Sequence, residues 1–376
     1  MQTNISKKYM TMKRITLGFS ALALTTAFVL GCNPKKNVEP EADVETESAV
    51  YASWMNYVVT DIDMMCSYLA ENNYDGKTFY SQYPGTSQTV TAVRDTQAIM
   101  IPVNGVLTEH DQLVIGFNTT KCLDGNVRDG SIFMYVPQKT PKNNKNVRYS
   151  RNYEWQGRII FKSYFINGWE VNNYGLDTVP AYMYNTLSSP NYSTGTTNLT
   201  WRFAGHLKFT HPSDPNKNME WEGELHKTLA NTSDPKVFAV SKQAAVQWSL
   251  AVLKYDGDVK GKVPQINAEA TPSIVANVPF SMSIHPETPL VRDFQCSPDQ
   301  VSGVAFTPTG SVTQRGDEHH PFKAGVASFS IGTPAQNFYP RQIYYGNEGQ
   351  PQLQAACDNV GEVLIKGISY RVNFMK

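Results

Sequence analysis

The sequence predicts a mainly β protein: antiparallel sheets arranged like a sandwich of two β units, preceded by one N-terminal helix. Short runs in which polar and apolar residues alternate recur along most of the chain, and a period of two is typical of half-buried strands. The chain holds 20 Tyr, 17 Phe and 6 Trp, and aromatic side chains suit pleated sheets. A clear helical period occurs in one segment.

The predicted helix spans Val50 to Leu69, where no Pro or Gly interrupts the pattern. Apolar residues recur there at intervals of three and four, which draws one apolar stripe along a helix. The stripe consists of Val50, Trp54, Val58, Ile62, Met65 and Leu69. The polar segment Asn72–Gly76 is expected to end the helix.

After the helix the chain reads as a succession of strands. The strongest local signal is Asn167-Gly168 between two aromatic runs in 157–171, which predicts a β-hairpin. The other predicted strands are 89–93, 98–103, 112–117, 200–210, 218–225, 244–254, 273–284, 301–306, 324–331, 342–345 and 362–374. The run 244–254 also permits a helical interpretation.

A turn cluster is predicted at Asp256–Pro264, with the sequence DGDVKGKVP, because Gly and Asp favour turns. It suggests a boundary between an N-terminal helix-plus-β domain, 49–262, and a C-terminal β unit, 263–376. A weak internal repeat supports two units, since Cys122 and Cys357 each follow a strand and a glycine and precede an acidic residue.

The first 31 residues have the features of an export signal. Four basic residues, Lys7, Lys8, Lys13 and Arg14, precede the uncharged run 15–30, which is short for a membrane span. The run ends in Val29-Leu30-Gly31-Cys32, which resembles the bacterial lipobox, although Leu30 departs from its usual small residue. The resemblance implies cleavage before Cys32 and attachment of a lipid such as palmitate to it. An ordinary cleaved signal is the alternative.

Residues 32–48 are predicted to be an acidic, flexible tether, because they lack aromatic side chains and carry five acidic ones. Such a tether resembles the surface-export signals of Bacteroidota lipoproteins, and a plain linker is the alternative. The predicted partner is thus a membrane, reached through the lipid on Cys32. Basic and acidic residues number 33 each, so removal of the cationic signal leaves the mature chain at −4, which argues against nucleic-acid binding.

Four cysteines remain after Cys32, an even number that favours disulfides in an exported chain. Of the three possible connectivities, matched spacing favours Cys66 with Cys122, 56 residues apart, and Cys296 with Cys357, 61 apart. None of them lies in a CxxC motif or a Cys/His cluster, so no zinc site is predicted.

Polar clusters that suggest chemistry each have a simpler structural interpretation. Asp124, Asn126 and Asp129 resemble part of a calcium loop, but Arg128 opposes the ion and turn chemistry explains them. The segment 315–320, RGDEHH, is expected to be a solvated loop rather than a metal site.

Three glutamates, Glu220, Glu222 and Glu224, alternate along one predicted strand and therefore share a face. Paired carboxylates serve glycoside hydrolysis, but a solvated strand face is the expected role. Several aromatic residues could stack on sugars, although aromatic strands are usually core. These are Tyr153, Trp155, Tyr164, Phe165 and Trp169.

Four segments together resemble a group of uncharacterised Bacteroidota surface lipoproteins. They read IGFNTTKCLDGNVRDGSIFMYV, FKSYFINGWEV, PLVRDFQC and YYGNEGQPQLQAACDNVGEVLIKG. The resemblance implies a β-rich exported fold and carries over no reaction and no site residue.

We therefore expect a lipid-anchored lipoprotein of the outer membrane, facing the periplasm or the surface, that acts as a non-enzymatic binding or scaffold module without a cofactor. The sequence contains no HExxH, GxSxG, Walker A or Rossmann glycine motif. The alternative is a secreted hydrolase of glycan or peptide whose site is assembled from distant residues.

Overall fold

The computed structural model describes the helix and strands of the chain and the short segments between some of them. The described residues are 44–71, 91–103, 106–122, 126–137, 155–175, 179–185, 200–230, 251–266, 274–293, 322–332, 341–346 and 360–374. Residues 42–376 form one compact unit. Within the described residues, no helix is both long and apolar enough to cross a membrane.

The described strands form one antiparallel sheet of fifteen strands, which confirms the predicted β-rich fold with an N-terminal helix. The strands are β1 (Thr91–Val103), β2 (Val106–Lys121), β3 (Val127–Pro137), β4 (Gln156–Ile166), β5 (Trp169–Asn173), β6 (Ala181–Asn185), β7 (Thr200–Thr210), β8 (Met219–Leu229), β9 (Val252–Ile266), β10 (Ile274–Ile284), β11 (Leu290–Asp293), β12 (Phe322–Ile331), β13 (Arg341–Tyr345), β14 (Val360–Ile365) and β15 (Ile368–Asn373). A short 3₁₀ turn, η3 (Pro215–Lys217), connects β7 to β8.

Most strands pair with their neighbours in sequence, in the order β1-β2-β3-β4-β5-β7-β8-β9-β10-β12-β13-β14-β15. The two remaining strands add side branches, since β6 pairs with β4 and β7, and β11 pairs with β9 and β12. Strands from both halves of the chain thus belong to one continuous sheet rather than to two separate ones. The predicted hairpin is present, with Asn167 and Gly168 at φ 50° and 82° between β4 and β5.

The predicted turn cluster at 256–264 is wrong, because these residues lie inside β9, which pairs with β8, β10 and β11. Its glycines serve close packing of strands. A Cβ on Gly261 would lie 1.8 Å from the carbonyl oxygen of Glu220 on β8, so only glycine fits there. The proposed boundary at residue 262 therefore falls within a strand of the central sheet.

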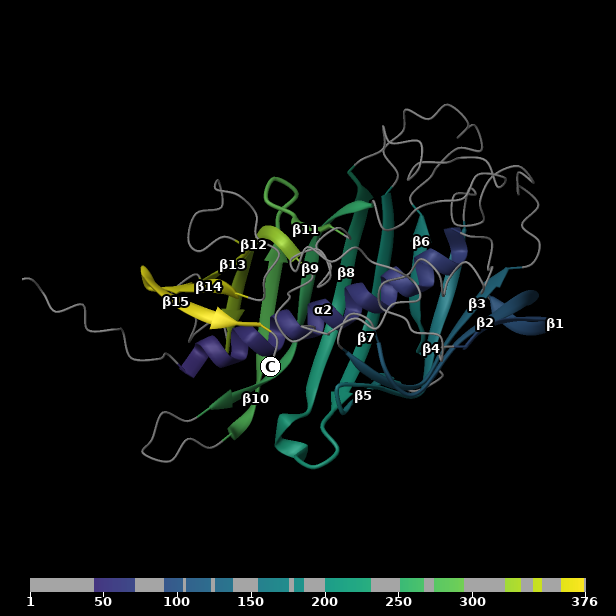
Figure 1. Cartoon of the computed structure of the whole chain (residues 1–376), viewed down its shortest axis with the longest axis horizontal. Coiled ribbons are helices and arrows are strands. Elements are labelled where there is room, and N and C mark those ends of the chain that lie inside the picture. Colours follow the sequence, from purple (N-terminus) through teal and green to yellow (C-terminus); the bar gives the residue numbers. More distant parts are fainter. Residues whose placement is uncertain are drawn as a thin grey trace, which may run out of the picture. The chain divides into compact units, whose positions relative to one another are not determined.

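Helix α2 (Val44–Glu71) begins six residues before the predicted start and includes the last residues of the predicted tether. Glu47 lies in its first turn, where an acidic side chain interacts favourably with the helix dipole. In Figure 1 the helix crosses the strands of the sheet. Every residue from 55 to 70 is buried, so the helix is covered on all sides and not only along the predicted stripe.

Buried ion pairs join α2 to the sheet. Asp61 contacts Arg128 of β3 at 2.6 Å and Arg292 of β11 at 3.4 Å. Asp63 accepts a hydrogen bond from Lys227 of β8 at 2.7 Å. The helix itself contains no basic residue, so the charges that neutralise its aspartates come from distant strands.

The predicted disulfide between Cys66 and Cys122 is absent from the structure, in which both side chains are buried thiols. Each has its own polar surroundings: Cys66 follows Asp63 on the helix beside Lys227, and Cys122 closes a turn by donating its backbone N–H to the carbonyl of Asn126. Sequence spacing alone does not set the geometry that a disulfide needs. Cys32, Cys296 and Cys357 lie outside the described residues.

Candidate functional site

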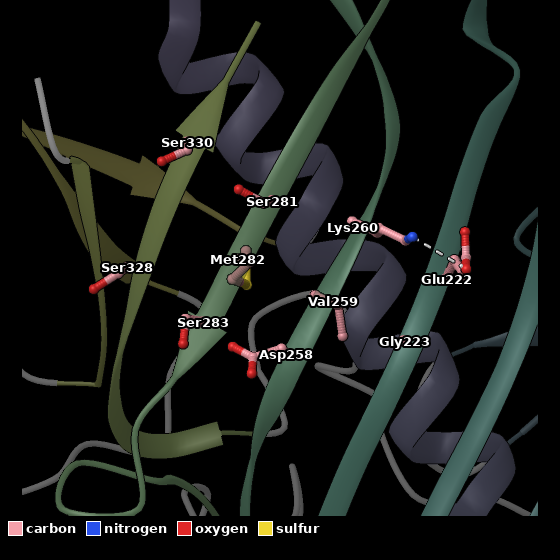
Figure 2. Close-up of a pocket in the computed structure, with 10 residues that line it drawn as sticks. All are labelled: Glu222, Gly223, Asp258, Val259, Lys260, Ser281, Met282, Ser283, Ser328 and Ser330. Atoms are coloured by element: carbon pink, nitrogen blue, oxygen red, sulfur yellow. Dashed lines mark ion pairs between the residues drawn. The ribbon is translucent and has the colours of Figure 1, made fainter. Parts of the chain in front are cut away.

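An open groove of about 430 Å³ lies on the outer face of β8, β9, β10 and β12 (Figure 2). The inner face is identified by Trp221 and Met282, which both contact Asn56 of the buried helix. Because successive side chains on a strand alternate between faces, their neighbours project outward. The lining residues are Glu222, Gly223, Asp258, Val259, Lys260, Ser281, Met282, Ser283, Ser328 and Ser330.

The register of the four strands aligns the polar groups in two rows. In the first row, Glu222 lies opposite Lys260, Lys260 opposite Ser281, and Ser281 opposite Ser330. In the second, Asp258 lies opposite Ser283, which lies opposite Ser328. The four serines therefore form a two-by-two array of hydroxyls, with two carboxylates and an ammonium group beside it (Figure 2).

The charged groups of the groove are open to solvent. The ammonium group of Lys260 and the carboxylate of Glu222 are 3.3 Å apart, and their side chains are 65% and 45% exposed. An exposed pair of this kind contributes at most about 1 kcal/mol to stability, so a ligand could displace it at low cost.

Gly223 also lines the groove, between the outward-facing Glu222 and Glu224 on β8. A Cβ at Gly223 would lie 2.5 Å from the carbonyl oxygen of Asp258 and 2.7 Å from a methyl carbon of Val259. The close approach of β8 and β9 thus requires glycine at this position.

A second polar cluster, here called the Glu224 cluster, lies on the same face as the groove and consists of Tyr184, Arg202, Glu224, His226 and Asp256. Tyr184 donates to Glu224 at 2.5 Å, and Arg202 donates to it at 2.7 Å. The His226 ring bridges the carboxylates of Glu224, at 3.1 Å, and Asp256, at 3.0 Å. Four strands, β6 to β9, thereby hold one carboxylate in a fixed orientation.

Burial alone would raise the pKa of Glu224, but the hydrogen bonds from Tyr184 and His226 and the charge of Arg202 outweigh burial and lower this pKa. Glu224 is thus held as a carboxylate. A general acid in glycoside hydrolysis needs the opposite shift, towards a raised pKa.

An exposed aromatic pair borders the groove on the side of β7. The ring of Tyr174, which is 50% exposed, stacks on His206 with centroids 3.8 Å apart and planes at 7°. A backbone hydrogen bond from Tyr174 N–H to the His206 carbonyl, at 2.9 Å, fixes the pair. His206 lies opposite Glu222, so the pair continues the first polar row of the groove.

The three alternating glutamates share the outer face of β8, as predicted, and each has a cationic neighbour. Glu220 accepts from Lys262 at 3.0 Å, Glu222 pairs with Lys260, and Glu224 belongs to its own cluster. Glu222 lines the groove and Glu224 belongs to the flanking cluster, whereas Glu220 pairs with Lys262 outside both.

The aromatic residues considered as sugar platforms are mostly core. Trp155 and Tyr164 are buried, and Trp169 packs against Trp54 of α2 with ring centroids 5.2 Å apart. Tyr153 lies outside the described residues. The exposed aromatic ring beside the groove is instead Tyr174, which sequence reasoning did not single out.

The candidate calcium-loop residues that the structure describes have structural contacts. Asn126 is buried, donates to the Tyr57 hydroxyl of α2 and accepts from Asn167 at 2.8 Å. Asp129 accepts from the backbone N–H of Thr119 at 3.0 Å. Asp124 and the segment 315–320 lie outside the described residues. Over the part of the chain that the structure describes, no group of three His, Cys, Asp or Glu side chains is placed to hold a metal ion.

Sequence reasoning also missed the serine array. One signal was available: Ser281-Met-Ser283 and Ser328-Phe-Ser330 repeat a polar–apolar–polar pattern, which places both serines of each strand on one face. The pairing of β10 with β12, which brings the four serines together, is seen only in the tertiary structure.

No family model, curated protein or solved structure matches this chain.

Proposed function

We propose that this protein is an exported, lipid-anchored surface lipoprotein that acts as a non-enzymatic binding module. The observation that carries the binding part is the open polar groove over β8–β12, on a sheet whose opposite face packs on a buried helix. A helix that is buried on all sides and ion-paired to three strands makes the sheet a rigid support. Rigid support lowers the entropic cost of binding at its surface.

The state of Glu224 suits hydrogen bonding to a ligand better than the general-acid role in glycoside hydrolysis. Its carboxylate accepts hydrogen bonds from three side chains and its pKa is lowered, so it does not supply the proton that a glycosidase acid must donate. Fixed, charged and partly exposed, it suits recognition of a ligand through hydrogen bonds.

The binding proposal is tested by photo-crosslinking in intact cells. A photoreactive amino acid replaces Ser330 in the groove or, as a control, Ser369 on the outer face of β15. We expect an adduct from the groove position that disappears when Asp258→Asn and Glu222→Gln are added, and no adduct from the control. Equal adducts from both positions, or none from the groove, would overturn the proposal.

The anchor is tested separately. The motive is the cationic segment and apolar run that end in Gly31-Cys32. Cys32→Ala should move the protein from the membrane fraction to the soluble fraction, whereas Cys66→Ala, the matched control, should leave fractionation unchanged. A Cys32→Ala protein that stays in the membrane fraction would contradict lipidation.

A further inference from the structure

We infer that the ligand of the groove is a neutral carbohydrate chain, an inference that rests on the proposed binding function and names its ligand class. The first observation is the exposed Tyr174 ring, stacked on His206 in line with the polar row that starts at Glu222. An aromatic face that is both exposed and fixed offers an apolar surface to the C–H face of a sugar ring.

The second observation is the chemistry of the polar rows. Each serine hydroxyl both donates and accepts, and an ionised carboxylate accepts from two donors at once. Sugar hydroxyls have the same dual character, so the array of Ser281, Ser283, Ser328 and Ser330, with Asp258 at its side, can satisfy several hydroxyls of one ring or of two linked rings. Neighbouring strands repeat about every 4.8 Å, which provides an extended polar track.

The third observation is charge. The groove carries two carboxylates, Glu222 and Asp258, against one ammonium group, Lys260, and so has a net negative charge. The adjacent Glu224 cluster holds two more carboxylates, which contact Arg202 and His226. Uronic acids and sulfated sugars would meet like charge in the groove, so a neutral sugar is favoured over an acidic one.

The position of the groove disfavours an extended peptide. Peptides that add to a sheet pair with the free edge of a strand. The groove instead lies on the face of β8, β9, β10 and β12, each of which is paired with neighbours on both sides. Recognition must therefore use side chains, as the two polar rows provide.

The test uses the purified full chain and isothermal titration with neutral probes, namely oligosaccharides of glucose, mannose, galactose and N-acetylglucosamine, and with oligogalacturonate as the acidic probe. We expect at least one neutral series to bind and oligogalacturonate not to bind. Tyr174→Ala should weaken binding roughly tenfold, the scale of one aromatic contact, while Tyr174→Phe should retain it.

Asp258→Asn and the double variant Ser281→Ala/Ser283→Ala should also weaken binding by about tenfold each, the cost of one or two lost hydrogen bonds. The matched controls are Tyr344→Ala on β13 and Glu362→Gln on β14, outer-face residues with partners outside the groove. They should change binding by less than about twofold. Thermal melting of every variant separates lost binding from lost folding.

Two results would overturn the inference: no binding to any neutral probe at millimolar concentration, or binding that Tyr174→Ala and Asp258→Asn leave unchanged. If a protein is crosslinked at Ser330 in cells while no sugar binds, the carbohydrate inference fails and the binding module stands. If neither sugar nor crosslinked adduct is found, the binding module fails as well.

Discussion

At the scale of single residues, the buried contact between Lys227 and Asp63 shows how this fold holds its helix. Lys227 donates to Asp63 at 2.7 Å and to the Ser67 hydroxyl, and its ammonium lies 5.5 Å from the Trp201 ring centre. The Tyr255 hydroxyl donates to the same carboxylate at 3.2 Å. Both charges are thus fully satisfied, which a buried ion pair requires.

Removing one partner of this pair should be costly. Lys227→Met leaves the Asp63 charge buried without its cation, and we expect the free energy of unfolding to fall by about 3–5 kcal/mol. Lys260→Met, which breaks the exposed pair with Glu222, should change it by less than about 1 kcal/mol. Urea denaturation followed by tryptophan fluorescence measures both. Similar losses in the two variants would contradict the buried network.

The state of the cysteines gives a second prediction at this scale. Burial, followed by the nearby Asp63 charge, raises the pKa of the Cys66 thiol well above its ordinary value. Because the thiolate is the reactive form, native Cys66 should resist alkylation by iodoacetamide even at pH 9.

The measurement compares native and denatured protein without reductant. In guanidinium, Cys66 and Cys122 should both become alkylated, as peptide mapping would show, because no disulfide joins them. If both stay unlabelled until a reductant is added, the two cysteines form a disulfide, which would contradict the prediction.

At the scale of elements, α2 and β9 differ from expectation for related reasons. Residues 44–48 look like a flexible acidic tether in the sequence, but they form the start of the helix. The Gly- and Asp-rich segment 256–264 looks like a turn, but it lies in a central strand. Tertiary contacts override weak local propensity in each case. Ser48, for example, is buried and donates to the Pro264 carbonyl of β9 at 2.9 Å.

A pair of glycine variants tests this account of β9. Gly261→Ala places a Cβ against the Glu220 carbonyl, which forces β8 and β9 apart, and we expect a loss of about 3 kcal/mol or more. Gly168→Ala in the β4–β5 turn meets no atom within 4 Å and bears only the strain of its positive φ, about 1–2 kcal/mol.

Thermal unfolding followed by circular dichroism measures the two variants side by side. Equal melting temperatures would mean that close packing of strands is not what requires glycine at position 261.

At the scale of the molecule, the sheet is continuous across the point where the sequence suggests a boundary. β9 pairs with β8 on one side and with β10 and β11 on the other, so the halves share a strand. The helix adds a second link, because Ser53 near its start bonds the Tyr345 hydroxyl at 2.9 Å while Ser67 near its end contacts Met183 at 3.1 Å. We therefore expect residues 42–376 to fold as one cooperative unit.

A chain truncated after Lys262 tests this expectation. It retains the helix and β1–β8 but cuts β9 and removes its partners β10 and β11, so it exposes the helix and a long strand edge. We expect no cooperative thermal transition from the truncated protein and a single one from the mature chain. A sharp transition in the fragment would show that the N-terminal part is an independent domain.

Much of the fold could be predicted from local sequence pattern, because each helix, strand or hairpin is favoured by residues that are close together in the sequence. The alternation along 200–210, the Asn167-Gly168 turn and the apolar period after residue 50 each specify a strand, a hairpin or a helix without reference to the rest of the chain. The shared face of Glu220, Glu222 and Glu224 was predictable for the same reason.

Which residues meet was decided only by the tertiary structure. Asp61 reaches Arg128 and Arg292, 67 and 231 positions away, and the groove joins β8 and β9 to β12 across a long intervening stretch. Periodicity tells which face a side chain occupies, but not which strands lie side by side, since pairing depends on the burial and hydrogen bonding of the whole sheet. For this reason the strands and the helix could be read from the sequence, whereas the buried network and the binding groove could not.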